Sequence, residues 1–170
     1  MSINDQIIIN LACGRLKQIR PKLPRDRELR KLYLYHELYQ EIRRDREDEF
    51  EDEKYAALEA ELETFIISPT LDSNYLRHLR PKREGIWAIR SRNPEPQIRV
   101  FSMFAERNCL ISFNMADRPD LDDDDAVWNY EMNRAKHLWR SLFHNAYHWM
   151  KTDKPNKLFS GAIDERYDRA

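Results

Sequence analysis

Residues 75–118 constrain the fold more than any other stretch, because only here do apolar residues alternate along the chain as they do in β-strands. In the first predicted strand, Trp87 and Ile89 share one face of the sheet, whereas Ile86, Ala88 and Arg90 share the other. The hairpin that follows is apolar on both faces, which predicts that both are at least partly covered. We predict three antiparallel strands, over residues 86–92, 97–105 and 108–115.

Helical segments are predicted before this sheet. Residues 2–19 have the pattern of a short amphipathic helix, and Pro21 and Pro24 then mark a linker. Neither Gly nor Pro occurs between Asp26 and Ile67. Two apolar stripes in this span predict an acidic helical hairpin, since the two stripes can bury each other.

Two further helical segments are predicted. A short helical turn runs from residue 72 to residue 79, where Pro81 stops it. A long C-terminal helix covers residues 124–151, because Trp128, Met132, Trp139 and other apolar residues fall on one broad face at helical spacing. We expect this face to cover the sheet.

These elements define an α+β fold, in which a small antiparallel sheet of three or more strands packs on helices, with an N-terminal helical hairpin and a long C-terminal helix. Only three glycines occur among 170 residues, which favours long helices over an all-β design. A chain of this length is most simply one compact domain. Its expected parts are an N-terminal segment and linker (1–25), the helical hairpin (26–67), the α+β core with the C-terminal helix (68–151) and a loosely attached tail (152–170).

The cysteines and the apolar runs indicate a reduced protein in the cytoplasm. Cys13 and Cys109 are far apart and match no metal-binding spacing. The N-terminal apolar run lacks a preceding positive charge and is broken by Asn10, so it does not fit a secretory signal. No run approaches the roughly 20 apolar residues that span a bilayer. We therefore expect a cytoplasmic protein with no membrane partner.

Charge is divided unevenly along the chain, although the net charge is only −1. Residues 25–66 carry eight basic and fourteen acidic side chains, while residues 67–118 carry nine basic and five acidic ones. Arginine suits phosphate recognition because its planar guanidinium group grips a phosphate through two donors. The basic residues that we predict to bind nucleic acid are Arg77, Arg80, Lys82, Arg83 and Arg92.

Each of these features also has a structural interpretation. The basic cluster could be a surface that the acidic helices balance, and the acidic run could be a solvated helix face or a partner surface. The acidic block could also fold back over the basic strands as a built-in inhibitor. Tyr75 and Trp87 could stack on unpaired bases, although a position in the core is favoured for Trp87.

Two further groups are candidates for a metal or for acid–base chemistry. His137, His144 and His148 fall within about 40° of one another on an ideal helix, and the last two have the i, i+4 spacing of a chelating pair. A solvated face is favoured, because no third ligand lies near. The aspartates of residues 122–125 are explained by capping of the next helix. We expect no metal and no cofactor, since glycine-dependent phosphate loops are missing as well.

The sequence GIWAIRSRNPEPQIRVFSMFAERNCLISFNM, residues 85–115, resembles the central sheet of the RelE/ParE toxin superfamily, nearest to its HigB-like branch. In that family a strand of the form Gly-Ile-Trp-x-Ile-Arg is followed by one that carries Ile-Arg-Val-Phe and then by an apolar strand. Arg90 matches the arginine that closes the first strand, and Arg99 matches the arginine of the second. The resemblance implies that both are catalytic and that they hold and polarise the scissile phosphate of messenger RNA without a metal.

Three functions from different classes follow from these observations. The leading hypothesis is a RelE-like endoribonuclease toxin, for which the resemblance implies the ribosome and an antitoxin as partners. The second is a non-enzymatic RNA- or protein-binding module that uses the basic sheet for attraction alone. The third is an adaptor or assembly protein, such as those of phages or mobile elements, whose C-terminal helix and acidic block contact partners.

Overall fold

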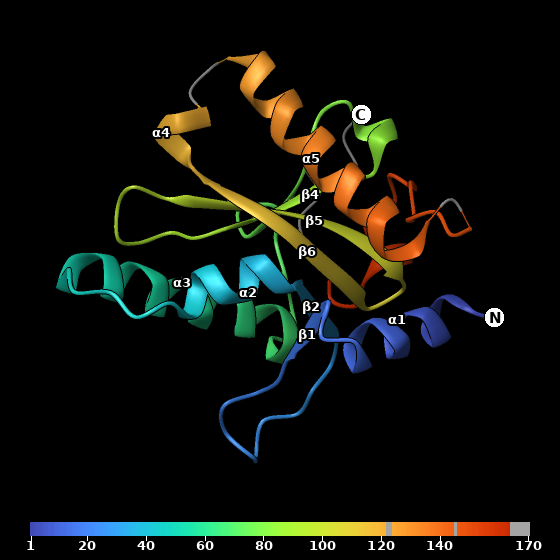
Figure 1. The fold of residues 1–170 in the computed structure, drawn as a ribbon, viewed down its shortest axis with the longest axis horizontal. Coiled ribbons are helices and arrows are strands. Elements are labelled where there is room, and N and C mark those ends of the chain that lie inside the picture. Colours follow the sequence, from blue (N-terminus) through green and yellow to red (C-terminus); the bar gives the residue numbers. More distant parts are fainter. Residues whose placement is uncertain (122–123, 145, 164–170) are drawn as a thin grey trace.

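The computed structural model describes residues 1–121, 124–144 and 146–163, and its centre is a six-stranded mixed sheet with helices on both faces (Figure 1). The strand order is β1-β2-β6-β5-β4-β3, with β2 parallel to β6 and every other neighbouring pair antiparallel. The strands are β1 (Leu16–Ile19), β2 (Lys31–Tyr35), β3 (Leu76–His78), β4 (Trp87–Arg90), β5 (Ile98–Glu106) and β6 (Cys109–Asp117). The helices are α1 (Ile3–Ala12), α2 (His36–Arg43), α3 (Glu49–Ile67), the 3-10 turn η1 (Lys82–Glu84), α4 (Arg118–Leu121), α5 (Asp125–Phe143) and α6 (Pro155–Leu158).

The α+β class is confirmed, and β4, β5 and β6 lie where the three strands are predicted. The sheet is larger than these three strands because segments predicted as helix join it at both ends. At one end, residues 76–78 form β3 and pair with β4, instead of continuing a helical turn. At the other end, β2 joins β6 and β1 joins β2.

The predicted helical hairpin is wrong at its start, because Lys31–Tyr35 form β2. Strand alternation sends Leu32 and Leu34 into one core and Tyr33 into the other, and all three side chains are at most 5% exposed. The predicted N-terminal helix likewise ends at Ala12. Gly14, at φ 75°, then turns the chain into β1.

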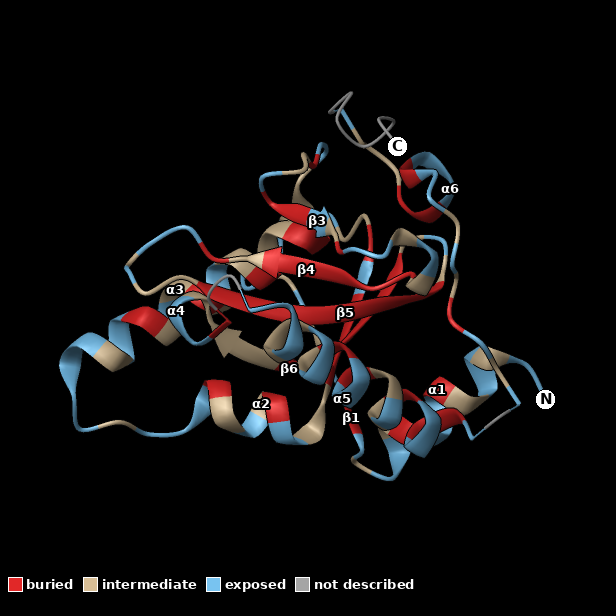
Figure 2. Ribbon diagram, turned by 90° about the horizontal axis from the view of Figure 1, so that it is seen from above, coloured by how far each residue is buried: buried red, intermediate tan, exposed pale blue. Residues whose placement is uncertain are grey.

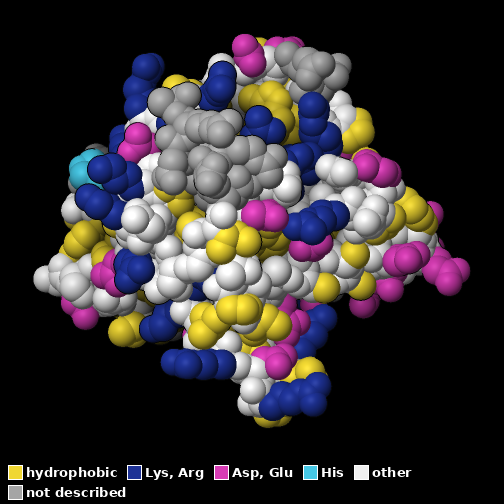
Figure 3. Space-filling view, turned by 180° about the vertical axis from the view of Figure 1, so that it is seen from behind, with side chains coloured by type: hydrophobic (Ala, Val, Ile, Leu, Met, Phe, Trp, Pro, Cys, Tyr) yellow, Lys and Arg dark blue, Asp and Glu magenta, His cyan; other side chains and the backbone are white. Residues whose placement is uncertain are grey.

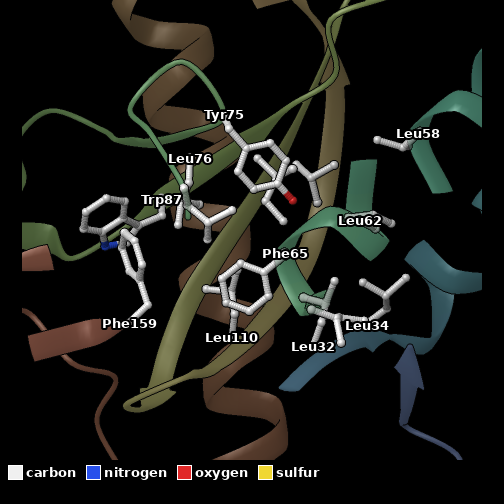
Figure 4. Close-up of a cluster of buried hydrophobic side chains, with 14 of the residues drawn as sticks. Leu32, Leu34, Leu58, Leu62, Phe65, Tyr75, Leu76, Trp87, Leu110 and Phe159 are labelled. Carbon is white, nitrogen blue, oxygen red and sulfur yellow. The ribbon is translucent and has the colours of Figure 1, made fainter. Parts of the chain in front are cut away.

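The first core lies between the sheet and the helices α2 and α3 (Figure 1). Leu58, Leu62 and Phe65 project from successive turns of α3 toward side chains of the sheet, among them Leu32 and Leu110 (Figure 4). All five side chains are at most 1% exposed. Burial of this kind stabilises a fold by about 1.5–3 kcal/mol for each large apolar side chain.

The second core lies on the opposite face, under α1 and α5. Met132, Ala135 and Trp139 of α5 are buried here, as their spacing predicts, and Trp139 packs against Phe113 of β6 with ring centroids 6.0 Å apart. Because both faces are covered, β4 and β5 are buried along most of their length (Figure 2). The hairpin of β5 and β6 is buried on both faces along most of its length, so the prediction that its two faces are at least partly covered is confirmed.

The predicted C-terminal helix is shorter than expected. α5 ends at Phe143. The next residue, His144, has a φ of 52°, and a right-handed helix cannot continue through a residue with a positive φ. The backbone N–H of Met150 then donates to the carbonyl of Phe104 at 2.8 Å, so the chain after residue 145 runs along the sheet instead of extending the helix.

The prediction of a loosely attached tail is wrong for residues 152–163. Phe159 is fully buried, with its ring 5.7 Å from Phe104 and 6.0 Å from Trp87, measured between centroids (Figure 4). The carbonyl of Leu158 accepts from the N–H of Asn108 at 2.8 Å. We refer to residues 146–163 as the C-terminal strap, and residues 164–170 lie outside the described part of the chain.

Arg30 links three parts of the fold from a fully buried position, with 1% of its surface exposed. Its guanidinium group donates to the carbonyl oxygens of Phe65 and Ser68, both at 2.8 Å, and to that of Ser160 at 3.1 Å. It also lies over the ring of Phe65, 5.6 Å from its centroid. Burial lowers the pKa of Arg30. The side chain thus connects the end of α3 to the strap through acceptors that all belong to the backbone.

Candidate nucleic-acid interface

A basic groove of about 1020 Å³ lies beside the sheet, between β3 and the start of α5. Its inner lining comes from the face of the sheet that carries Ala88, which is the face covered by α5. One carboxylate, that of Asp125, is among the groove residues in the described part of the chain. Against it stand six cationic side chains, from Arg77, Arg80, Lys82, Arg90, Arg99 and Arg118.

The strand register brings three arginines onto this face. Arg90 of β4 is the direct pairing partner of Arg99 of β5, and Arg77 of β3 is the partner of Ala88. Because side chains alternate between faces, Arg77, Arg90 and Arg99 all project from the same side of the sheet. The two arginines that the family resemblance marks as catalytic are therefore cross-strand neighbours, which the sequence alone left open.

Arg99 is the most buried of these three arginines, and hydrogen bonds hold its side chain in place. Its side chain is 4% exposed, and its guanidinium group donates to the carbonyl of Ile98 at 3.1 Å and to the side-chain oxygen of Gln97 at 2.9 Å. Burial, followed by the charges of Arg90 and Arg118, lowers the pKa of Arg99 to about 10. It is still protonated at neutral pH, so the groove contains a buried cation of fixed orientation.

The groove brings together cations of which three, Arg77, Arg90 and Arg99, have no ion-pair partner among the described residues. Within the described residues, no carboxylate lies within ion-pair distance of Arg77, Arg90 or Arg99. The pKa of Arg90 is lowered as well, first by burial and then by the neighbouring charge of Arg77. Like charges at close range favour the binding of an anion, because its charge relieves their repulsion.

The wall of the groove that faces the sheet comes from α5. Trp128 lines it, half-buried, with its ring 5.9 Å from Phe101 and 6.0 Å from the guanidinium carbon of Arg118. Sequence reasoning assigned Trp128 to the apolar stripe of the helix and did not identify Arg118 as a site residue. Arg118 comes directly after the carboxyl end of β6, and Trp128 lies in the first turn of α5, the next long helix, so their place in the groove follows from where the chain leaves the sheet.

Other residues predicted to bind nucleic acid have different outcomes. Arg77, Arg80 and Lys82 line the groove, whereas Arg83 and Arg92 do not. Arg92 is exposed, and one of its nitrogens lies 3.9 Å from the Asp72 carboxylate. Tyr75 and Trp87 are at most 2% exposed and belong to the first core, so neither offers a surface for stacking on a base. The core position that is favoured for Trp87 is confirmed.

The acidic helices do not cover the face of the basic strands that lines the groove. α2 and α3 pack on the face of the sheet that carries Trp87 and Ile89, opposite the groove. Asp and Glu side chains gather at the projecting end of α3, at the right of Figure 3. The hypothesis of a built-in inhibitor is therefore wrong, and the groove faces away from this acidic surface.

The proposed histidine face does not form. His144 is the residue that ends α5, and His148 lies beyond the helix, so the i, i+4 pair does not share a helical surface with His137. Among the described residues, no group of three or more His, Cys, Asp or Glu side chains could hold a metal ion. Asp122 and Asp123, part of the aspartate run, lie outside those residues.

Among the described residues, His78 is the histidine that borders the groove. Its ring stacks on that of Trp87, 4.2 Å away and 4° from parallel. Burial, together with the charge of Lys82, lowers the pKa of His78 from 6.5 to about 4. At neutral pH the ring is therefore uncharged, and its stacking on Trp87 places it on the face of the sheet that carries the first core.

We expect His78 to make stability depend on pH between 4 and 6.5. Below pH 6.5 the unfolded chain binds a proton that the folded protein does not, so stability falls as the pH falls. The contribution is about 2 kcal/mol at pH 4, after allowance for partial exposure of the ring. His78→Phe keeps an aromatic ring on Trp87 but removes the titration. Urea unfolding of both proteins from pH 4 to pH 7 checks this, and parallel stability profiles would contradict it.

Comparisons with protein-family models, with curated proteins and with solved structures find no match for this chain. The resemblance of residues 85–115 to RelE/ParE toxins therefore stays a prediction. None of the helices in the described residues is both long and apolar enough to span a membrane.

Proposed function

We propose that this protein binds single-stranded RNA through the groove, with a backbone phosphate held by Arg90 and Arg99. The observation that carries the proposal is the convergence of Arg77, Arg90 and Arg99, from three adjacent strands, without a carboxylate partner among the described residues. Guanidinium groups bind phosphate through paired donors. Since the arginines project from neighbouring strands, successive phosphates of one strand of RNA could follow the groove.

The shape and composition of the groove favour a single strand over a duplex. Trp128 stands in the wall that faces the arginines, where an unpaired base could stack on it. Stacking of this kind requires bases that are splayed out of a helix, and double-stranded RNA does not offer them. An arginine-lined groove with an aromatic wall is the combination that binders of single-stranded nucleic acids use.

Cleavage of the bound RNA is a second candidate, favoured by the direct pairing of Arg90 with the buried Arg99. In this reaction the 2′-hydroxyl oxygen attacks the adjacent phosphorus and loses its proton to water, while the bond from phosphorus to the 5′-oxygen breaks and that oxygen takes up a proton from water. The products are a 2′,3′-cyclic phosphate and a 5′-hydroxyl end. Arg90 and Arg99 would stabilise the negative charge that builds up on the non-bridging oxygens, and fixed donors of this kind commonly contribute 10²–10³-fold to a rate.

RNA binding is tested by fluorescence anisotropy with a labelled oligouridylate at increasing salt concentration. We expect affinity to fall steeply with salt, because each phosphate contact releases counterions. Unlabelled double-stranded RNA should compete more weakly than unlabelled single-stranded RNA. Affinity that does not change with salt would contradict the proposal.

Cleavage is tested separately, by incubating the protein with labelled RNA in the presence of a chelator. The toxin hypothesis predicts fragments with cyclic phosphate ends and growth arrest when the protein is induced in bacterial cells. Intact RNA alongside normal salt-dependent binding would exclude cleavage and leave the binding function in place.

A further inference from the structure

The side of the groove formed by α5 carries acidic, amide and apolar side chains, which are not needed to bind a phosphate. Asp125, Trp128, Asn129 and Met132 come from the first two turns of α5 and all line the groove. Their spacings of three and four residues place them on one face of the helix. Cations are missing from this set, so this face of α5 differs in chemistry from the arginines on the sheet.

Trp128 offers a flat surface whose position is fixed. Its ring contacts Phe101 and Arg118 while it remains partly exposed. Few rotamers are sterically allowed for a side chain within a helix, and the contacts of Trp128 with Phe101 and Arg118 reduce their number further. The ring therefore loses little conformational freedom when a base stacks on it.

The carboxylate of Asp125 limits which base can bind beside Trp128, because the base must supply hydrogen-bond donors. Its side chain is exposed and makes no hydrogen bond or ion pair with the described residues. A carboxylate repels phosphate, so its place in a groove for RNA is beside a base. An ionised carboxylate can only accept hydrogen bonds, through two oxygens side by side.

Guanine matches this acceptor better than the other bases. Its Watson–Crick edge carries the N1–H and N2–H donors next to each other, so one base can donate to both carboxylate oxygens. Adenine and cytosine each place an amino donor beside a ring nitrogen that would repel a carboxylate, and uracil places its single N–H between two carbonyl oxygens. Asn129, one turn along the same face, has an amide that could donate to the guanine O6.

We propose that the first two turns of α5 form a guanine subsite, in which the base stacks on Trp128 and donates to Asp125 while its phosphate lies on Arg90 and Arg99. This inference rests on the proposed RNA-binding function and adds a sequence preference to it. The subsite makes the groove discriminate between RNA sequences, whereas the arginines alone would bind all of them alike.

The test compares oligouridylates of about six nucleotides that carry one guanosine, inosine or adenosine at the same position. A 2′-deoxy backbone removes the attacking hydroxyl and prevents cleavage during the measurement. We expect the guanosine oligomer to bind about tenfold more tightly than the adenosine oligomer, with inosine between them because it lacks the N2 amino group.

Asp125→Asn is the decisive variant. It should lose the preference for guanosine, while its affinity for the adenosine oligomer stays the same or rises because a repulsive charge has been removed. Glu53→Gln is the matched control, since Glu53 is an exposed carboxylate on α3, across the sheet from the groove, and this variant should keep the preference. Trp128→Ala should weaken binding of every oligomer by about tenfold, whereas Tyr130→Ala, which removes an exposed aromatic ring outside the groove, should not.

The outcomes separate the subsite from the function on which it rests. Equal affinity of the natural protein for the guanosine and adenosine oligomers would overturn the subsite and leave RNA binding intact. An Asp125→Asn variant that keeps the guanosine preference would overturn the role of Asp125. Failure to bind any of the oligomers, even at low salt, would overturn the proposed function itself.

Discussion

Replacing Arg90 with alanine should weaken the binding of single-stranded RNA by roughly tenfold to a hundredfold, because a hydrogen bond to a charged group contributes about 1.5–3 kcal/mol. The logarithm of affinity against the logarithm of salt concentration should also become less steep by about one unit, since one fewer counterion is displaced. Anisotropy titrations at several salt concentrations measure both quantities. Arg90 is the preferred position because its side chain is only partly buried, so its truncation leaves a smaller cavity than truncation of Arg99.

A variant of Arg99 tests whether Arg90 and Arg99 bind the same phosphate. If both guanidinium groups hold the same phosphate, an Arg90→Ala/Arg99→Lys double variant should lose less affinity than the two single losses added together. Arg99→Lys keeps the charge but not the planar fork that donates to Gln97 and Ile98. Arg140→Ala, on the exposed side of α5, is the matched control. Unchanged affinity and salt dependence in the Arg90 variant would show that the groove is not the RNA site.

Replacing Arg30 with methionine should destabilise the protein by about 3–5 kcal/mol. Methionine fills a similar volume, but it leaves the carbonyl oxygens of Phe65, Ser68 and Ser160 without the donor that they share. A loss of this size corresponds to a fall in melting temperature of roughly 10 °C for a chain of this length. Arg30→Lys should recover only part of the loss, because an ammonium group has three donors in a different geometry.

Thermal and urea unfolding of the Arg30 variants measure this effect directly. Arg25→Met, which replaces an exposed arginine, is the control and should unfold like the natural protein. If Arg30→Met unfolds within about 1 kcal/mol of the natural protein, the connection that Arg30 makes between α3 and the strap is not a main source of stability.

The parts of the fold that sequence reasoning predicted correctly depend on local patterns. The period-two alternation of Trp87, Ala88 and Ile89 placed these residues on the correct faces, and the helical spacing of Met132, Ala135 and Trp139 found the buried stripe of α5. Neither result required knowledge of a distant contact. Patterns of this kind are set by the geometry of one element.

The misassigned parts depend on contacts between segments far apart in the chain. KLYLY, residues 31–35, has apolar residues at positions compatible with either a helix or a strand, and it becomes β2 because β6 lies beside it in parallel. The ion pair between Lys54 and Asp117, at 2.9 Å, and the burial of Phe159 also join distant segments. Such pairings carry no signal within a short window of one sequence.

The candidate site was predictable in composition but not in geometry. The density of basic residues singled out Arg77, Arg80 and Lys82, which line the groove, and the family resemblance singled out Arg90 and Arg99, which line it too. Their binding of nucleic acid stays a prediction. Their convergence depends on strand register, which one sequence does not fix. Trp128 and Asp125 were assigned to a core stripe and to a helix cap, because their place beside the groove follows from how α5 lies across the sheet.

The C-terminal strap also determines when the first core can be completed during synthesis of the chain. Phe159 completes a core whose other large members, Trp87 and Phe104, are translated more than fifty residues earlier. A ribosome therefore releases all the arginines of the groove before it releases the ring that packs behind their strands. The growing chain therefore carries the cations of the groove early, but it completes the core behind their strands only when residue 159 has emerged.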